Sequence, residues 1–163
     1  MMEPGDLYGL PLERFTDERN ALVRELRRAG RSDDATEVGK LRKPSLAAWA
    51  VNQLVRTQRR EVTALFKAGD ALMDAQAKLL AGRGDSAKLR KANDAERAAV
   101  ERLTEKARGL LSGDGHELNS ARLEQVSETL HAAALDGDAR KQVTDHLAED
   151  LVAQAQAQDG VDR

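Results

Sequence analysis

The sequence predicts an all-α fold, a single-domain helical bundle, and three observations carry this prediction. Alanine and leucine dominate the 40% of residues that are hydrophobic, whereas isoleucine is absent and aromatic residues amount to 2%, a composition that favours helix over strand. Apolar residues recur three and four positions apart along most of the chain, which is the spacing of a buried helical face. Glycine-containing segments interrupt this pattern and predict loops between helices. We expect the domain to span residues 1–152, followed by a frayed or disordered tail over 153–163.

The N-terminal part of the chain predicts a short apolar lead-in and two helices. The lead-in, residues 7–12, has the sequence Leu-Tyr-Gly-Leu-Pro-Leu, and Pro11 suits the first turn of the helix that follows. This helix is expected to end at Gly30. Ser32 is expected to cap a second, short helix, and Pro44 ends it because the residue before a proline avoids the helical region.

Two long helices are predicted to form an antiparallel hairpin over about residues 58–82 and 86–112, because the segment between them is very short. They follow a helix that begins at Pro44 and runs through Trp49, and the sequence leaves open whether it continues past Thr57. The expected buried seam of the hairpin comprises Val62, Leu65, Phe66, Leu72, Met73, Leu79 and Leu80 on the first helix and Leu89, Ala92, Ala99, Val100, Leu103, Ala107 and Leu110 on the second.

Two further helices are predicted to close the bundle, with the N-terminal helices packed against the other end of the hairpin. Asn119 or Ser120 is expected to cap the first of the two. The pair Gly-Asp recurs at residues 84–85, 113–114 and 137–138. We expect its glycine to end one helix and its aspartate to begin the next.

The composition also limits the class of function. The chain has no cysteine, which excludes disulfides, thiolate metal sites and cysteine nucleophiles. No apolar run reaches the roughly 20 residues of a membrane span, and the acidic N-terminus does not resemble a signal sequence. We therefore expect a cytoplasmic protein that does not bind membranes.

No catalytic or cofactor-binding motif stands out. The three histidines, His116, His131 and His146, are expected on separate elements, so we predict no metal site and no cofactor. The glycines at residues 82 and 84 lack the lysine and the preceding strand of a phosphate-binding loop. An enzyme is therefore the least favoured class of protein.

Residues 40–60 form a basic segment with no acidic residue, in a chain whose net charge is −2. Its cationic side chains are candidates for contacts with phosphate or carboxylate groups, and they are Lys40, Arg42, Lys43, Arg56, Arg59 and Arg60. They lie toward the two ends of a helix about 20 Å long. The alternative is that they form an ordinary solvated run of charge.

The helix within this segment has two unlike sides. Leu46, Ala47, Ala50, Val51, Leu54 and Val55 fill one broad apolar arc, and the opposite side carries Ser45, Trp49, Asn52, Gln53 and Arg56. Tryptophan beside amides and arginine is typical of surfaces that stack on rings and bind partners. The alternative is that Trp49 packs against another helix with its N–H bonded to a neighbour, while Asn52 and Gln53 satisfy buried carbonyl groups.

Residues 41–54, Leu-Arg-Lys-Pro-Ser-Leu-Ala-Ala-Trp-Ala-Val-Asn-Gln-Leu, resemble a motif of an uncharacterised actinobacterial family of all-helical proteins. The lead-in over residues 7–12 and the sequence Arg-Asn-Ala-Leu over 19–22 are similar to that family as well. The resemblance covers about residues 7–60. It implies an all-helical fold, and it brings no activity, cofactor or catalytic residue with it.

These observations favour a non-catalytic binding protein that uses residues 40–60 to contact an acidic macromolecule, either nucleic acid or protein. The alternative is a structural or adaptor module that forms a homodimer, or pairs with another protein, through its alanine- and leucine-rich hairpin.

Overall fold

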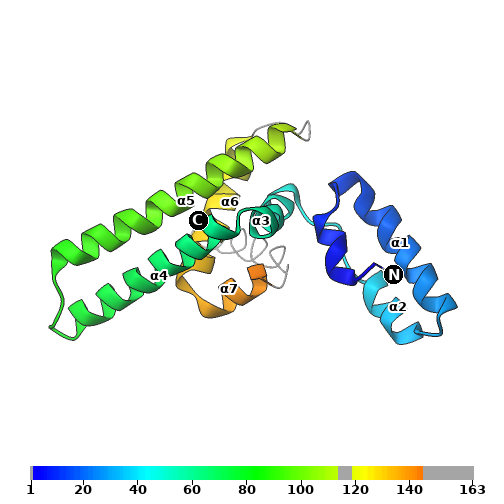
Figure 1. Ribbon diagram of the computed structural model, residues 1–163, viewed down its shortest axis with the longest axis horizontal. Helices are drawn as coiled ribbons and strands as arrows, with labels where there is room; N and C mark the ends of the chain where they lie inside the picture. The colour runs from blue at the N-terminus through cyan, green and yellow to red at the C-terminus, as the bar shows by residue number, and fades with distance from the viewer. Residues whose placement is uncertain (1, 114–118, 145–163) are drawn as a thin grey trace, which may run out of the picture.

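The structure, a computed structural model, describes residues 2–113 and 119–144. All regular secondary structure in this part of the chain is helical, as predicted, and it contains no strand (Figure 1). The elements are η1 (Pro4–Gly9), α1 (Leu12–Arg28), α2 (Ser32–Gly39), α3 (Leu46–Thr57), α4 (Arg59–Leu80), α5 (Ser86–Gly113), α6 (Ser120–Leu135) and α7 (Gly137–Thr144). None of these helices is long and apolar enough to span a bilayer. The predicted tail, residues 153–163, lies outside the described residues, as do His116 and His146.

Helices α4 and α5 form the predicted antiparallel hairpin (Figure 1). Gly82 has φ +74°, in the left-handed region that glycine adopts readily after a helix end. Asp85 accepts a hydrogen bond at Oδ1 from the backbone N–H of Ala87 (2.8 Å) and so caps α5, as predicted. Helix α3 does not continue into α4, because Gln58 leaves the helical conformation between them.

The predicted seam of α4 is wrong beyond Leu72. Met73 and Leu79 are each 39% exposed and Leu80 is 91% exposed. The reason is that α6 and α7 cover only the half of the hairpin nearest α3, so within the described residues the distal half of α4 contacts no third helix (Figure 1). Helical periodicity identifies the side of a helix that is apolar, but it does not say where along that side a neighbour ends.

Helix α3 is the centre of the larger core. It contacts α4, α5, α6 and α7 on its apolar side, and η1 contacts it as well. Every residue from Ala47 to Leu54 is buried, including those on the side predicted to be polar. The largest buried side chains around it are Leu54, Leu65, Leu103, Leu111, Leu130, Val51, Val126 and Val143.

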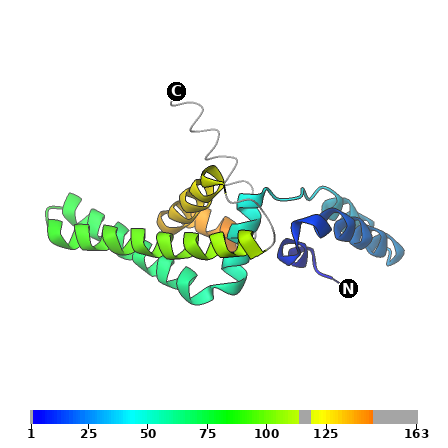
Figure 2. The ribbon, with the colours of Figure 1, turned by 90° about the horizontal axis from the view of Figure 1, so that it is seen from above.

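Residues 2–41, called here the N-terminal unit, have a separate small core. Its buried members are Leu7, Phe15, Leu22, Leu26, Ala35 and Val38. The unit adjoins α3 through η1 (Figure 2), whereas the sequence predicted that it packs against the hairpin. Ser32 also differs from prediction, because it is the first residue of α2 and its side chain caps nothing; the N-cap position belongs to Arg31.

Helices α6 and α7 are joined by a tight turn that Asp136 stabilises. Asn119 caps α6 by accepting a hydrogen bond from the N–H of Ala121 (2.8 Å). Asp136 Oδ1 accepts one from the N–H of Asp138 (3.0 Å). The prediction that Asp138 begins the last helix after a terminating Gly137 is therefore wrong, since Gly137 is already helical and the capping aspartate precedes it.

Arg140 joins α7 to both α6 and α4, and we expect its replacement by methionine to lower the free energy of unfolding by about 2 kcal/mol. Its Nη2 donates to the carbonyl of Ala134 (2.8 Å) and to Asp70 Oδ1 (2.9 Å), and its guanidinium lies 4.6 Å from the centre of the Phe66 ring. Methionine keeps the apolar stem and removes every donor. Urea unfolding followed by circular dichroism measures the loss, and Lys141→Met, at an exposed position of the same helix, should change stability by under about 0.5 kcal/mol.

Candidate functional site

Three side chains of the predicted binding face hold the chain's own N-terminal segment. Trp49 is 5% exposed, and its Nε1 donates a hydrogen bond to the carbonyl of Leu10 (2.8 Å). Gln53 Nε2 donates to the carbonyl of Tyr8 (2.7 Å), and Arg56 Nη2 donates to the carbonyl of Gly5. Positions four and three residues apart share one stripe of a helix, so the three donors lie side by side on α3. They bind carbonyl groups along η1 and at Leu10, the residue that follows it.

The other two residues of that face are also engaged or enclosed. Ser45 Oγ accepts a hydrogen bond from the N–H of Ala48 (3.2 Å) and caps α3. Asn52 is 1% exposed, and neither atom of its amide group has a hydrogen-bond partner within the described structure. The alternative of a packed tryptophan with a bonded N–H therefore describes Trp49 and Gln53, whereas Asn52 satisfies no carbonyl.

The cationic side chains of residues 40–60 fall into two groups separated by α3. Lys40 pairs with Glu37 (Nζ···Oε1 3.2 Å) on the surface, and Arg42 and Lys43 are exposed in the segment between α2 and α3. At the other end of α3, exposed Arg59 and Arg60 line an open cavity of about 390 Å³ together with Thr63, Ala64 and Lys67. The basic segment is thus not one surface, and its second group extends to a residue, Lys67, that lies outside it.

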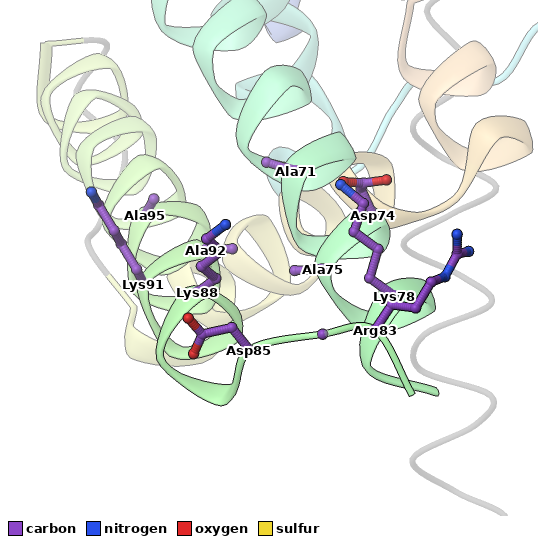
Figure 3. A pocket seen from close by; sticks show the side chains of 11 residues that line it. Ala71, Asp74, Ala75, Lys78, Arg83, Asp85, Lys88, Lys91, Ala92 and Ala95 are labelled. Carbon is purple, nitrogen blue, oxygen red and sulfur yellow. The ribbon is translucent and has the colours of Figure 1, made fainter. Parts of the chain in front are cut away.

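A second cavity, called here the tip groove, lies between the distal ends of α4 and α5 (Figure 3). Its volume is about 410 Å³, and four alanines form its apolar part: Ala71, Ala75, Ala92 and Ala95. The remaining side chains of its lining are charged: Asp74, Lys78, Arg83, Asp85, Lys88 and Lys91. Sequence reasoning did not identify it, although alanines four apart on one helix and three apart on the next were the available signal.

A buried carboxylate, Glu96, pairs with the half-exposed imidazole of His131, and the sequence analysis also missed this pair. Glu96 is fully buried in α5, and its Oε1 lies 2.6 Å from Nδ1 of His131 on α6. Its Oε2 has no partner within the described residues. Glu128 stands three residues before His131, a spacing that some metal-binding bundles use, and the prediction of no metal site overlooked it. No group of three or more ligating side chains in the described part of the chain is arranged to hold a metal ion.

No known protein family, curated protein or solved structure matches this chain. The resemblance of residues 7–60 to the actinobacterial family therefore stays a prediction. Three features of the molecule bear on its function: the face of α3 covered by η1, the cationic cavity at the start of α4, and the tip groove.

Proposed function

We propose that this chain is a non-catalytic docking module whose tip groove binds an acidic amphipathic helix of another protein. The observation that supports it best is that no residue from Met73 to Lys91 is buried, although two helices run side by side there. A helix in a stable fold normally buries one stripe against a neighbour. Among the described residues the distal hairpin has no third helix packed on it, and a partner helix would supply one.

The shape of the tip groove suits a helix. Its apolar part consists of alanines on both α4 and α5, and small side chains allow a third backbone to approach closely. Met73, Leu79 and Leu80 add exposed apolar surface to the same end of the hairpin. These three side chains do not line the groove, whose own apolar surface is that of its alanines. Exposed apolar surface on a single chain commonly marks a protein interface.

The charges around the tip groove favour an acidic partner. Four cationic side chains line the groove, compared with two carboxylates, Asp74 and Asp85. The cations are Lys78, Arg83, Lys88 and Lys91. Asp74 already pairs with Lys78 (3.0 Å), and Asp85 caps α5. Arg83, Lys88 and Lys91 thus remain available for carboxylates on a docked helix, where complementary charge fixes orientation and speeds association.

Site-specific photo-crosslinking in cells that make the protein tests this proposal. A photoreactive residue at Lys88 should give an adduct that mass spectrometry maps to an acidic helical segment of another protein. The same residue at Ala77, which is exposed but does not line the groove, should give none. Ala75→Glu with Ala92→Glu should reduce the adduct by about tenfold or more, because it places like charges opposite the partner, and Ala77→Glu should not. An adduct of twice the chain's mass, or equal adducts from both positions, would contradict the proposal.

The second candidate function is binding of nucleic acid at the cationic cavity at the start of α4. Arg59, Arg60 and Lys67 have no acidic partner within the described residues. Arg59 and Arg60 also lie in the first turn of α4, where the helix dipole favours anions. Titration of labelled DNA and RNA at about 50 and 200 mM salt tests it, since phosphate contacts give a steep salt dependence. Arg59→Glu with Arg60→Glu should abolish binding and flatten that dependence, and Lys88→Glu should do neither. Equal weakening by both would point to nonspecific attraction.

A further inference from the structure

We propose that the N-terminal unit is a hinged cover on α3, which undocks as a body and exposes Trp49, Asn52, Gln53 and Arg56 as a second binding surface. Four features of the structure support this, concerning the two cores, the docking contacts, the covered face and the connection. The proposal does not depend on the tip groove, which lies at the far end of the hairpin (Figure 1).

The first feature is that the N-terminal unit keeps its own core. Leu7 of η1 is fully buried in the small cluster, and Tyr8 contacts the ring of Phe15 (5.6 Å between centroids). Segment η1 is therefore anchored to α1 and α2 by its side chains and to α3 by its carbonyl groups. Among the described residues, Leu12 is the one apolar side chain of the unit that belongs to the large core. Undocking would leave the small core intact.

The second feature is a set of three hydrogen bonds in the docking contact, beside the buried apolar area of Leu12 and Trp49. Three side chains of α3 donate to the carbonyls of Gly5, Tyr8 and Leu10. Water can replace such bonds at a small net cost, unlike the loss of packed apolar area. Contacts of this kind between units within a chain resemble those of transient complexes, for which relative motion is the default.

The third feature is Asn52, which stands one residue before Gln53 and four before Arg56 on α3. Its amide group is buried with neither atom bonded within the described structure. A buried amide without partners raises the free energy of the docked state. Water or a ligand that reaches this amide after undocking would satisfy it, which lowers the cost of opening.

The fourth feature is the short connection between the N-terminal unit and α3, of which only two residues are held by neither. Arg19 Nη1 on α1 donates to the carbonyl of Leu41 (2.8 Å) and holds that residue to the N-terminal unit. Pro44 is buried and Ser45 caps α3, so both belong to the other body. Between them only Arg42 and Lys43 are exposed and outside any helix (Figure 2), and these two residues form the hinge.

The chemistry of the covered face defines the ligand that the open form would take. Its donors are an indole N–H, a primary amide and a guanidinium on one helical stripe, and they already bind three main-chain carbonyls within one short segment, those of Gly5, Tyr8 and Leu10. The surface thus fits a short segment with unpaired main-chain carbonyls, such as the C-terminal end of a partner's helix. Such a partner would compete directly with η1.

Acrylamide quenching of Trp49 fluorescence in the full chain tests the hinge, because this is the only tryptophan. Gln53→Met with Arg56→Met should raise the undocked fraction by about tenfold or more, since two hydrogen bonds to η1 are lost. We expect a larger quenching constant and a red-shifted emission maximum with unchanged far-ultraviolet circular dichroism. Arg59→Met with Arg60→Met, two exposed cations next along the chain that do not contact η1, should match the natural chain.

A second variant removes no contact at all. Insertion of Gly-Ser between Arg42 and Lys43 lengthens the hinge, which lowers the effective concentration of η1 at α3, and it too should increase quenching at constant helix content. Two results would overturn the proposal. One is quenching equal to that of the natural chain in both variants. The other is quenching that rises only together with a loss of helical signal, which would mean that α3 and its cover unfold as one body.

Discussion

Replacing Gly69 with alanine is expected to lower the free energy of unfolding by about 3 kcal/mol, the upper end of the usual cost of overpacking. Gly69 is buried in α4 where α6 crosses it. A Cβ there would lie 2.0 Å from the carbonyl oxygen and 2.7 Å from the carbonyl carbon of Ala134. Both are backbone atoms, so no side-chain rotation can relieve the overlap. Helix α6 would have to move away from α4, opening the core around Leu65 and Leu130.

Gly109 provides the matched control for this prediction. It lies inside α5, is exposed, and a Cβ at this position would meet no atom within 4 Å. Alanine is the better helix former, so Gly109→Ala should raise the free energy of unfolding by about 0.5–1 kcal/mol. The same substitution in two neighbouring helices should thus have opposite signs in urea unfolding. Stabilisation by both would show that α4 and α6 do not cross closely at Gly69.

The sequence predicts the helices of this protein well and their contacts less well. The hairpin was expected over 58–82 and 86–112, and its helices are Arg59–Leu80 and Ser86–Gly113, because glycine turns and helical periodicity are local signals. Which part of α4 is covered depends on where α6 and α7 lie. That is a long-range outcome, and it explains why Leu80 was wrongly expected in the core.

The candidate site shows the same limit. Periodicity placed Trp49, Gln53 and Arg56 together on one side of α3, and the structure agrees. Their partners are carbonyl groups 39 to 51 residues away in the sequence. Every residue has a backbone carbonyl, so a pattern of side chains does not show which carbonyls accept these bonds. A helix with donors on its polar side looks the same in sequence whether solvent, a partner or its own N-terminus covers it.

Glu96 could have been found from the sequence. It occupies the same stripe of α5 as Ala92, Ala99 and Leu103, which were predicted to be buried. A carboxylate on such a stripe requires a partner or costs several kcal/mol. The periodic pattern therefore predicts that another helix supplies a partner for this carboxylate. That partner is the imidazole of His131 on α6.

Replacing His131 with alanine is expected to lower the free energy of unfolding by about 3 kcal/mol, because it leaves the carboxylate of Glu96 buried without a partner. Glu96 is 0% exposed and its Oε2 is already unbonded within the described residues, so the contact with Nδ1 at 2.6 Å is its main compensation. His131 itself has 52% of its side chain exposed. Little buried apolar area is lost with the ring, so the loss of stability measures the effect of leaving Glu96 without its partner.

A second substitution separates the buried charge from lost packing. Glu96→Met keeps the length of the side chain and removes the carboxylate, and it should be neutral or stabilising. In that background His131→Ala should lower the free energy of unfolding by less than about 0.5 kcal/mol, since no buried carboxylate is left unpaired. Urea unfolding of the four chains at one pH gives the coupling energy, and Glu101→Met, which replaces an exposed carboxylate on the same helix, is the control. Equal losses from His131→Ala in both backgrounds would mean that the imidazole acts by packing alone. A coupling near 3 kcal/mol would instead show that the pair of Glu96 and His131 holds α5 and α6 together, although Glu96 lies on the apolar stripe of α5.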